Sequence, residues 1–121
     1  MKTCLVVDDS RTVRKIARKM LEQLAFSCEE AENGQQAIEL CSRAMPDAVL
    51  LDWNMPVLDG IGFLRLLRAM PGGDTPKVVF CTTENDLSHI QMAIAAGADE
   101  YIMKPFDNEI VESKLAQAGL I

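Results

Sequence analysis

Residues 48–56 read Ala-Val-Leu-Leu-Asp-Trp-Asn-Met-Pro (AVLLDWNMP), an unbroken apolar run that ends in an aspartate. Apolar residues at four successive positions favour a strand buried on both faces, as in a parallel sheet. The aspartate that follows, Asp52, is either a cap or turn residue, or a carboxylate held at the end of a buried strand for chemistry. The rest of the chain decides between these two interpretations.

Four more short strands are expected beside this one, each followed by a segment with helical periodicity. Ser10 and Asn33 are good N-caps for the first two helices. Five strand–helix units imply right-handed crossovers and an α/β fold with an open, doubly wound parallel sheet. The predicted strands are 3–7, 27–31, 48–51, 77–81 and 100–103, and the later helices cover 59–70, 87–97 and 108–118.

The helical periodicity also predicts which apolar side chains face the sheet. Ile16 in the first helix, Leu87 and Ile94 in the fourth, and Ile110 in the fifth all fall on apolar stripes. We expect these four side chains to be buried.

The length and composition predict one domain, residues 1–121, with nothing left for a further domain such as an output domain. We also expect a monomer. The net charge of −6 disfavours nonspecific nucleic-acid binding, which needs a basic surface. No apolar run approaches the roughly 18 residues of a membrane span, and the apolar stretch after Met1 is too short for a signal peptide. We therefore expect a cytoplasmic protein that binds neither membranes nor nucleic acid.

The four cysteines form no C-x-x-C pair and lie within or beside apolar segments, which predicts buried, reduced thiols. His89 is the only histidine, so a conventional zinc site is not expected, and a surface position is favoured.

Polar side chains follow four of the predicted strands. Ligands of doubly wound sheets bind outside the carboxyl ends of the strands, so these side chains are candidates for one site. Three carboxylates at one edge repel each other and raise each other's pKa, which makes a bound cation physically sensible. Mg²⁺ suits a site of few carboxylates, a carbonyl and waters. The residues are Asp8, Asp9, Asp52, Thr82, Thr83 and Lys104.

Four motifs occur in order: DD at 8–9, LLDWNMPVLDG at 50–60, TTE at 82–84 and YIMKPF at 101–106. Together they resemble the receiver domain of two-component response regulators, of the single-domain, chemotaxis (CheY-like) type. The resemblance covers essentially the whole chain and implies a flavodoxin-like fold with strand order 2-1-3-4-5.

The resemblance implies that Asp52 accepts a phosphoryl group. It also implies that Asp9, Asp52 and the backbone carbonyl of Asn54 bind Mg²⁺, with Asp8 acting through a bound water. Lys104 would contact Asp52 and then the phosphoryl group.

Further roles follow from the same resemblance. Thr82 would bind a phosphoryl oxygen, and Tyr101 would be the switch aromatic. The Lys104–Pro105 peptide bond would be cis. The output surface would include residues near the fourth and fifth helices: Asn85, Asp86, His89 and Lys114.

Three positions bear on the lifetime of the phosphoryl group. Thr83 stands where the family usually has a small residue, and its bulk could restrict water. Asn54 and Glu84 match the chemotaxis type at positions associated with rapid self-dephosphorylation. These indications oppose each other, and the sequence leaves the lifetime open.

The resemblance implies a signalling switch that catalyses only its own phosphorylation and dephosphorylation. Its phosphoryl donor would be a sensor histidine kinase or a histidine phosphotransfer protein, and its target an unknown protein. The basic run at positions 11–19 is either a solvated helix face or a docking surface for that donor.

Two other functions are considered. An aspartate-nucleophile phosphatase would carry D-x-D after its first strand, whereas here D-x-N follows the third. A flavodoxin-like cofactor binder would cradle phosphate in its first loop, but Asp8 and Asp9 repel phosphate there unless a metal intervenes.

Overall fold

The computed structural model describes residues 1–83 and 87–121. Its strands form one parallel sheet with the order β2-β1-β3-β4-β5, as the resemblance implied. The strands are β1 (Thr3–Val7), β2 (Ser27–Ala31), β3 (Ala48–Asp52), β4 (Lys77–Thr82) and β5 (Glu100–Met103).

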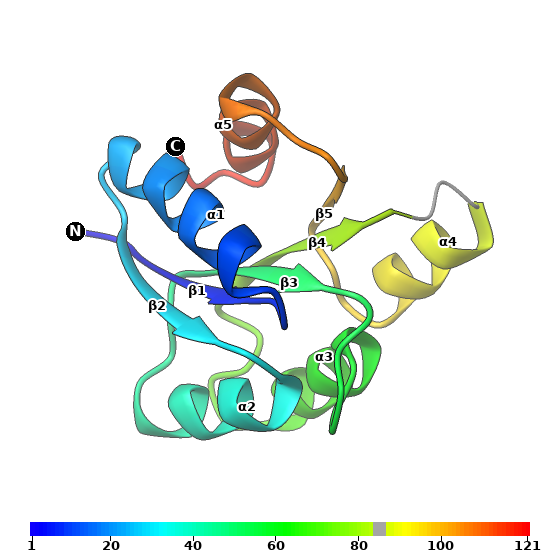
Figure 1. Ribbon diagram of the computed structural model, residues 1–121. Helices are drawn as coiled ribbons and strands as arrows, with labels where there is room; N and C mark the ends of the chain where they lie inside the picture. The colour runs from blue at the N-terminus through cyan, green and yellow to red at the C-terminus, as the bar shows by residue number, and fades with distance from the viewer. Residues whose placement is uncertain (84–86) are drawn as a thin grey trace.

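Helices cover both faces of the sheet (Figure 1). Those labelled α1 and α5 pack on one face, and α2, α3 and α4 lie toward the other. This arrangement is the doubly wound α/β fold expected from the sequence. The helices are α1 (Arg11–Gln23), α2 (Gly34–Arg43), α3 (Gly60–Ala69), α4 (Leu87–Ala95) and α5 (Asn108–Gln117).

The two predicted N-caps, Ser10 and Asn33, are confirmed, and Asp59, which was predicted to lie inside the third helix, caps it. The Ser10 hydroxyl accepts a hydrogen bond from the Val13 amide at the start of α1. The Asn33 side chain does the same for α2, and Asp59 for α3. Each cap satisfies an amide that has no partner inside its helix, which explains why the helices begin where they do.

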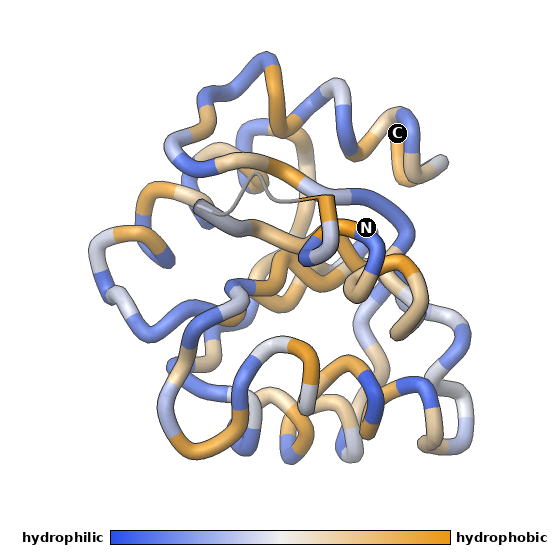
Figure 2. Tube along the Cα trace, turned by 90° about the vertical axis from the view of Figure 1, so that its right-hand side faces the viewer, coloured by the Kyte–Doolittle hydropathy of each residue, from blue (hydrophilic) through white to orange (hydrophobic). Residues whose placement is uncertain are grey.

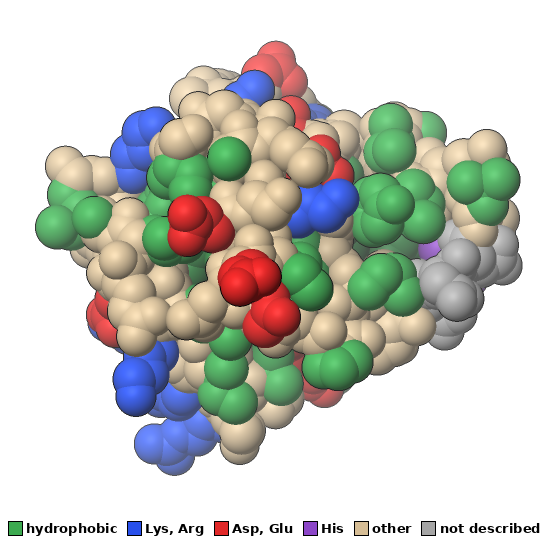
Figure 3. All heavy atoms as spheres, turned by 90° about the horizontal axis from the view of Figure 1, so that it is seen from above, with side chains coloured by type: hydrophobic (Ala, Val, Ile, Leu, Met, Phe, Trp, Pro, Cys, Tyr) green, Lys and Arg blue, Asp and Glu red, His purple; other side chains and the backbone are tan. Residues whose placement is uncertain are grey.

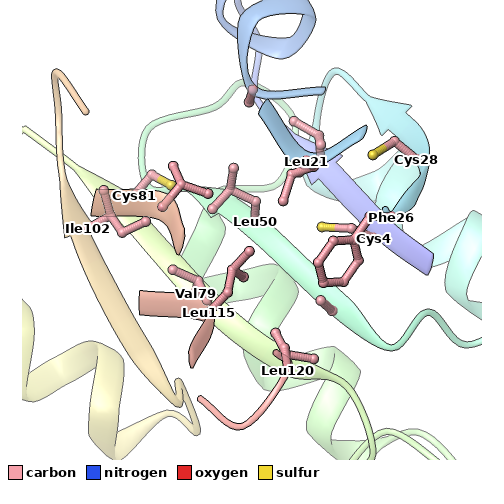
Figure 4. Close-up of a cluster of buried hydrophobic side chains, with 14 residues drawn as sticks. Cys4, Leu21, Phe26, Cys28, Leu50, Val79, Cys81, Ile102, Leu115 and Leu120 are labelled. Atoms are coloured by element: carbon pink, nitrogen blue, oxygen red, sulfur yellow. The ribbon is translucent and has the colours of Figure 1, made fainter. Parts of the chain in front are cut away.

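The core consists of two apolar layers, one on each face of the sheet. Leu50 and Val79 point into the layer beneath α1 and α5, where Leu21 and Leu115 meet them (Figure 4). Apolar segments run through the middle of the molecule, and polar ones lie mostly outside (Figure 2). The central strands are thus buried on both faces, as their unbroken apolar runs predict.

The four cysteines are free and buried, as expected. Burial raises the pKa of the Cys28 and Cys41 thiols to about 11, which keeps both protonated at neutral pH. Within the described ranges, no helix combines the length and the apolar composition needed to cross a membrane.

The predicted burial of four helical side chains is wrong. Ile16 is 50% exposed, Leu87 65%, Ile94 57% and Ile110 40%. Periodicity reports the angular position of a side chain on its helix, whereas burial depends on where the helix crosses the sheet. Helix α4 lies near the β5 edge, and Ala93 is its buried residue among those described.

Two strands extend one residue further than predicted. Asp52 pairs with Cys81 in the β3–β4 ladder, and Thr82 pairs with Met103 in the β4–β5 ladder. These two polar residues are therefore fixed by the sheet itself and do not belong to loops.

Candidate functional site

The carboxyl ends of β1, β3, β4 and β5 bring four predicted site residues to one edge of the sheet. Asp8 directly follows β1, Asp52 and Thr82 end their strands, and Lys104 directly follows β5. The first three are buried, with 4%, 8% and 4% exposure. A buried carboxylate is costly unless it has a charged partner, so the surroundings of these groups decide what they can do.

Lys104 is that partner. Its ammonium donates to Asp8 Oδ2 at 2.8 Å and to Asp52 Oδ1 at 2.9 Å. The backbone helps to place this cation, because the Lys104 amide donates to the Thr82 carbonyl at 2.8 Å. The Lys104–Pro105 bond is cis, as expected. The β5 end thus links the β1 and β3 carboxylates.

Asp52 is also fixed from the helical side. The amide of Gly60, at the start of α3, donates to the Trp53 carbonyl at 2.9 Å. A Cβ at position 60 would overlap the Asp52 carbonyl oxygen and come within 2.8 Å of the Phe80 ring. A glycine is therefore required for α3 to start this close to the phosphoacceptor candidate.

Lys104 compensates the negative charge of the site only in part. Burial raises the pKa of Asp52, Asp8 adds repulsion, and the hydrogen bond and charge of Lys104 only partly offset these effects. Burial alone would lower the pKa of Lys104, but the two carboxylates outweigh it and raise that pKa. One ammonium between several carboxylates leaves excess negative charge, which favours a further cation.

The three aspartates predicted to bind metal do come together. Asp8, Asp9 and Asp52 each offer a carboxylate oxygen, and these oxygens lie within 4.8 Å of one another. Asp9 is exposed and the other two are buried, so the cluster lies at the boundary between the core and solvent. Hard oxygen donors with room for water fit Mg²⁺. Asn54 is exposed in the loop two residues after Asp52.

Thr82 and Thr83 occupy opposite environments. Thr82 is buried beside the cluster at the end of β4, whereas Thr83 is exposed. Thr83 lines an open groove of about 340 Å³ together with Ile16, Pro105 and Phe106. Glu84, Asn85 and Asp86 lie outside the described residues, so the expectations placed on them stay predictions.

Tyr101 is half-buried and packs against the apolar layer of α2, α3 and α4. The Lys114 ammonium lies 4.6 Å from the centre of its ring and 3.1 Å from Glu100 Oε1. The ring is thus held between β5 and α5 by a cation–π contact and packing.

His89 is half-buried, so the surface position predicted for it is only partly correct. Its ring lies 4.9 Å from the ring of Trp53, edge to face, and Trp53 lies 4.9 Å from Phe80. This aromatic contact joins α4 to the loop that follows Asp52. A histidine beside a tryptophan in space cannot be foreseen from positions 36 residues apart in the sequence.

The sequence placed Arg14 only in the basic run and did not predict its contacts beside the site. Arg14 of α1 donates to the Asp8 backbone carbonyl and to Glu30 of β2. Lys15 and Arg18 also bind Glu30. The basic run is therefore partly neutralised, and Figure 3 shows separate small acidic and basic groups on the face that α1 and α5 cover.

The fold has close counterparts among solved structures. The chemotaxis protein CheY4 of Vibrio cholerae superposes with a TM-score of 0.92, at 29% identity, over 98% of both chains. The signal receiver domain of a histidine kinase from Syntrophus aciditrophicus gives 0.88, at 28% identity, over 98% of this chain and 89% of that one.

Sequence comparison points the same way. Response regulator MprA of Mycolicibacterium vanbaalenii is 41% identical over 102 residues, which are 84% of this chain and 43% of that protein. This chain therefore spans less than half of the length of the curated relatives it matches. The model of the response regulator receiver domain matches residues 4–116. The chain belongs to the response regulator receiver domain family.

Proposed function

We propose that this chain accepts a phosphoryl group on Asp52 and thereby switches its binding to a partner protein. The observation that carries the proposal is the buried Asp52 carboxylate, which is paired with Lys104 and lies beside two further carboxylates. The family match favours this function over an aspartate-nucleophile phosphatase or a flavodoxin-like cofactor binder.

The chemistry is a displacement at phosphorus. An Asp52 carboxylate oxygen forms a bond to phosphorus, and the bond between phosphorus and the donor breaks, with its electron pair leaving on the donor. With a phosphohistidine donor, the leaving group is the imidazole. Such a transfer asks the protein mainly for positioning and charge stabilisation.

Asp9, Asp52 and the carbonyl of Asn54 would hold Mg²⁺, and Asp8 would act through a water. A bound Mg²⁺ would offset the negative charge of the carboxylates and the incoming phosphoryl oxygens. Lys104 already lies at Asp52, so its ammonium can pass to a phosphoryl oxygen with little movement. Thr82, at the end of the neighbouring strand, would donate its hydroxyl to another.

Acetyl phosphate tests this function directly. With Mg²⁺, intact mass should rise by one phosphoryl group, and peptide mapping should place it on Asp52. Chelation should abolish the label, and so should Asp52→Asn. Asp74→Asn, at an exposed aspartate, is the matched control and should label normally. Persistence of the same label in Asp52→Asn would overturn the proposal.

We also propose that Thr82 and Tyr101 convert the phosphoryl group into a surface change. When the Thr82 hydroxyl turns toward a phosphoryl oxygen, the space it leaves can admit the ring of Tyr101. The ring is now half-buried beside Lys114, so a modest rotation changes the surface between β5 and α5. Moving the populations of two conformations from 1:99 to 99:1 requires a free-energy change of only about 5.5 kcal/mol.

Thr82→Ala should uncouple the two events: Asp52 still becomes labelled, but the label no longer changes partner binding. Thr83→Ala, at the exposed neighbour, should keep the coupling. The readout is affinity capture with phosphorylated and unphosphorylated protein, identified by mass spectrometry. Equal capture by phosphorylated Thr82→Ala and wild type would contradict this route.

The donor would be a sensor histidine kinase or a histidine phosphotransfer protein, since family members accept phosphate from histidine. The chain would catalyse only its own phosphorylation and dephosphorylation. Its action without an attached output domain and its monomeric state stay predictions. Equilibrium sedimentation with and without acetyl phosphate tests whether the protein is a monomer.

A further inference from the structure

Asp8 is held by four hydrogen bonds. Its two carboxylate oxygens accept from the Ser10 amide at 2.9 Å and from Lys104 at 2.8 Å. Its own amide donates to the Ala31 carbonyl at 3.1 Å, and its carbonyl accepts from Arg14 Nη1 at 2.7 Å. The last bond is the shortest of the four, and it comes from a side chain outside the acidic cluster.

Arg14 is itself anchored. Its Nε donates to Glu30 Oε1 at 3.1 Å, and the two side chains are only 12% and 14% exposed. A guanidinium is planar and rigid, so fixing one nitrogen on Glu30 fixes the direction of the other toward Asp8. The chain of contacts therefore runs from β2, through α1, to the end of β1.

Asp9 depends on this anchor. The Asp8 carbonyl belongs to the peptide unit that joins Asp8 to Asp9, and that unit is planar. Arg14 therefore sets the direction in which the chain enters Asp9. Asp9 is exposed, and within the described part of the chain no hydrogen bond or ion pair holds its carboxylate, so the backbone is what places this residue beside the cluster.

We propose that Arg14, oriented by Glu30, is a positioning residue that fixes the Asp8–Asp9 peptide and so preforms the cation site. The inference rests on the proposed function, because it takes the acidic cluster to bind Mg²⁺. Groups outside the ligand set that orient ligands contribute roughly 10–100-fold to metal affinity.

The charge of Arg14 makes the proposal testable by sign. A cation beside the cluster repels Mg²⁺, so on charge alone its removal would tighten Mg²⁺ binding. Positioning predicts the opposite: Arg14→Gln should weaken Mg²⁺ binding by about ten-fold or more. Trp53, the only tryptophan and the neighbour of Asp52, reports binding by its emission, independently of phosphorylation.

The chain offers a matched control. Arg18 also binds Glu30, at 3.0 Å, but no bond joins it to Asp8. Arg18→Gln therefore removes the same charge and the same kind of ion pair from the same helix. Its Mg²⁺ affinity should stay within about three-fold of wild type, in the tighter direction if at all.

Phosphorylation kinetics complete the test. Since positioning acts on the site before the transfer, Arg14→Gln should lose labelling at low Mg²⁺ and regain most of it at saturating Mg²⁺. Arg14→Lys keeps the charge and can reach only one partner at a time, so its Mg²⁺ affinity should lie between those of wild type and Arg14→Gln. If circular dichroism shows that Arg14→Gln does not fold, the milder variant Arg14→Lys takes its place in the Mg²⁺ titration.

Unchanged or tighter Mg²⁺ binding by Arg14→Gln overturns the positioning role, as does equal weakening in Arg18→Gln. If only Arg14→Lys can be measured, a Mg²⁺ affinity equal to that of the wild type overturns the positioning role. A wild-type protein with no emission response and no labelling would instead overturn the proposed function. The two failures are therefore distinguishable.

Discussion

Asp52 shows how a functional residue can oppose stability. Burial raises its pKa, so the folded state disfavours the charged form that the proposed phosphoryl transfer requires. A group with a raised folded pKa favours folding below its unfolded pKa, and this contribution is lost as the pH rises toward the folded value. At neutral pH, without a metal, the charge of Asp52 is therefore destabilising.

Asp52→Asn should accordingly stabilise the metal-free protein at pH 7, because it removes a buried charge that Lys104 only partly compensates. The gain should shrink as the pH falls toward the ordinary aspartate pKa of about 4, where both states become protonated. Urea denaturation in chelator at several pH values measures it. A gain that stays constant down to pH 4 would point to packing and not to charge.

Val57 has an unusual backbone. Its φ is +72°, in the left-handed region, and the Leu58 amide donates to the Pro56 carbonyl at 2.8 Å, which closes a γ-turn around it. A β-branched residue in this conformation is strained, and its side chain is 80% exposed, so packing does not compensate.

Val57→Asn should stabilise the protein by about 0.5–1 kcal/mol, because asparagine tolerates positive φ and no buried contact is lost. Val57→Ala removes the β-branch only and should gain less. Both are measured by urea denaturation with metal present and absent. A loss of stability in Val57→Asn would mean that the exposed valine makes a contact that outweighs the strain.

The contact between α1 and β2 depends on one carboxylate, that of Glu30 in β2. Although burial favours its neutral form, hydrogen bonds from Lys15, Arg18 and Arg14 lower the pKa of Glu30 to about 2. A depressed folded pKa contributes stability above the unfolded pKa of about 4.5, and that stability is lost as the pH falls toward 2.

Glu30→Gln should therefore cost about 1–2 kcal/mol at pH 7, since partial exposure of Lys15 and Arg18 screens part of the full effect. The difference from wild type should narrow between pH 4.5 and 2, the window set by the two pKa values. Glu29→Gln, at the exposed neighbouring position of β2, is the control and should change little. A pH-independent difference would exclude the charge as its cause.

Arg68 ties together parts of the fold that are distant in sequence. Its guanidinium donates to the carbonyls of Gly73, Pro76 and Gly97 and to the Asp99 carboxylate. Asp99 in turn accepts from the Val78 amide at 2.8 Å. One side chain of α3 thus closes the entry to β4 and the turn between α4 and β5.

Arg68→Met keeps the aliphatic stem but leaves these carbonyls without their donor, and should cost roughly 2–4 kcal/mol. Arg68→Lys should recover part of this, because one ammonium cannot reach all the acceptors. Arg65→Met, on the exposed face of α3, is the control. Thermal unfolding followed by circular dichroism measures all three variants. A loss of stability in Arg68→Met no larger than that in Arg65→Met would show that the Arg68 hydrogen bonds do not stabilise the fold.

The sequence by itself determined the elements, their order and the site's main residues. Strand and helix periods, capping residues and strand-end aspartates are local signals, so they can be interpreted without knowing what lies opposite. Asp8, Asp52 and Lys104 could be placed together because parallel strands end at a common edge. The motif resemblance added the strand order and the individual roles.

The tertiary structure alone decided which long side chains meet. Arg14 with Glu30, Arg68 with Gly97, and Trp53 with His89 are pairings between different elements and loops, at separations that no local sequence pattern covers. Likewise, the exposure of Ile16 and Leu87 depends on how far each helix overlaps the sheet. A periodic pattern gives the direction of a side chain from its own axis, whereas contacts depend on the position of the neighbouring element, and that position is fixed only when the whole sheet has formed.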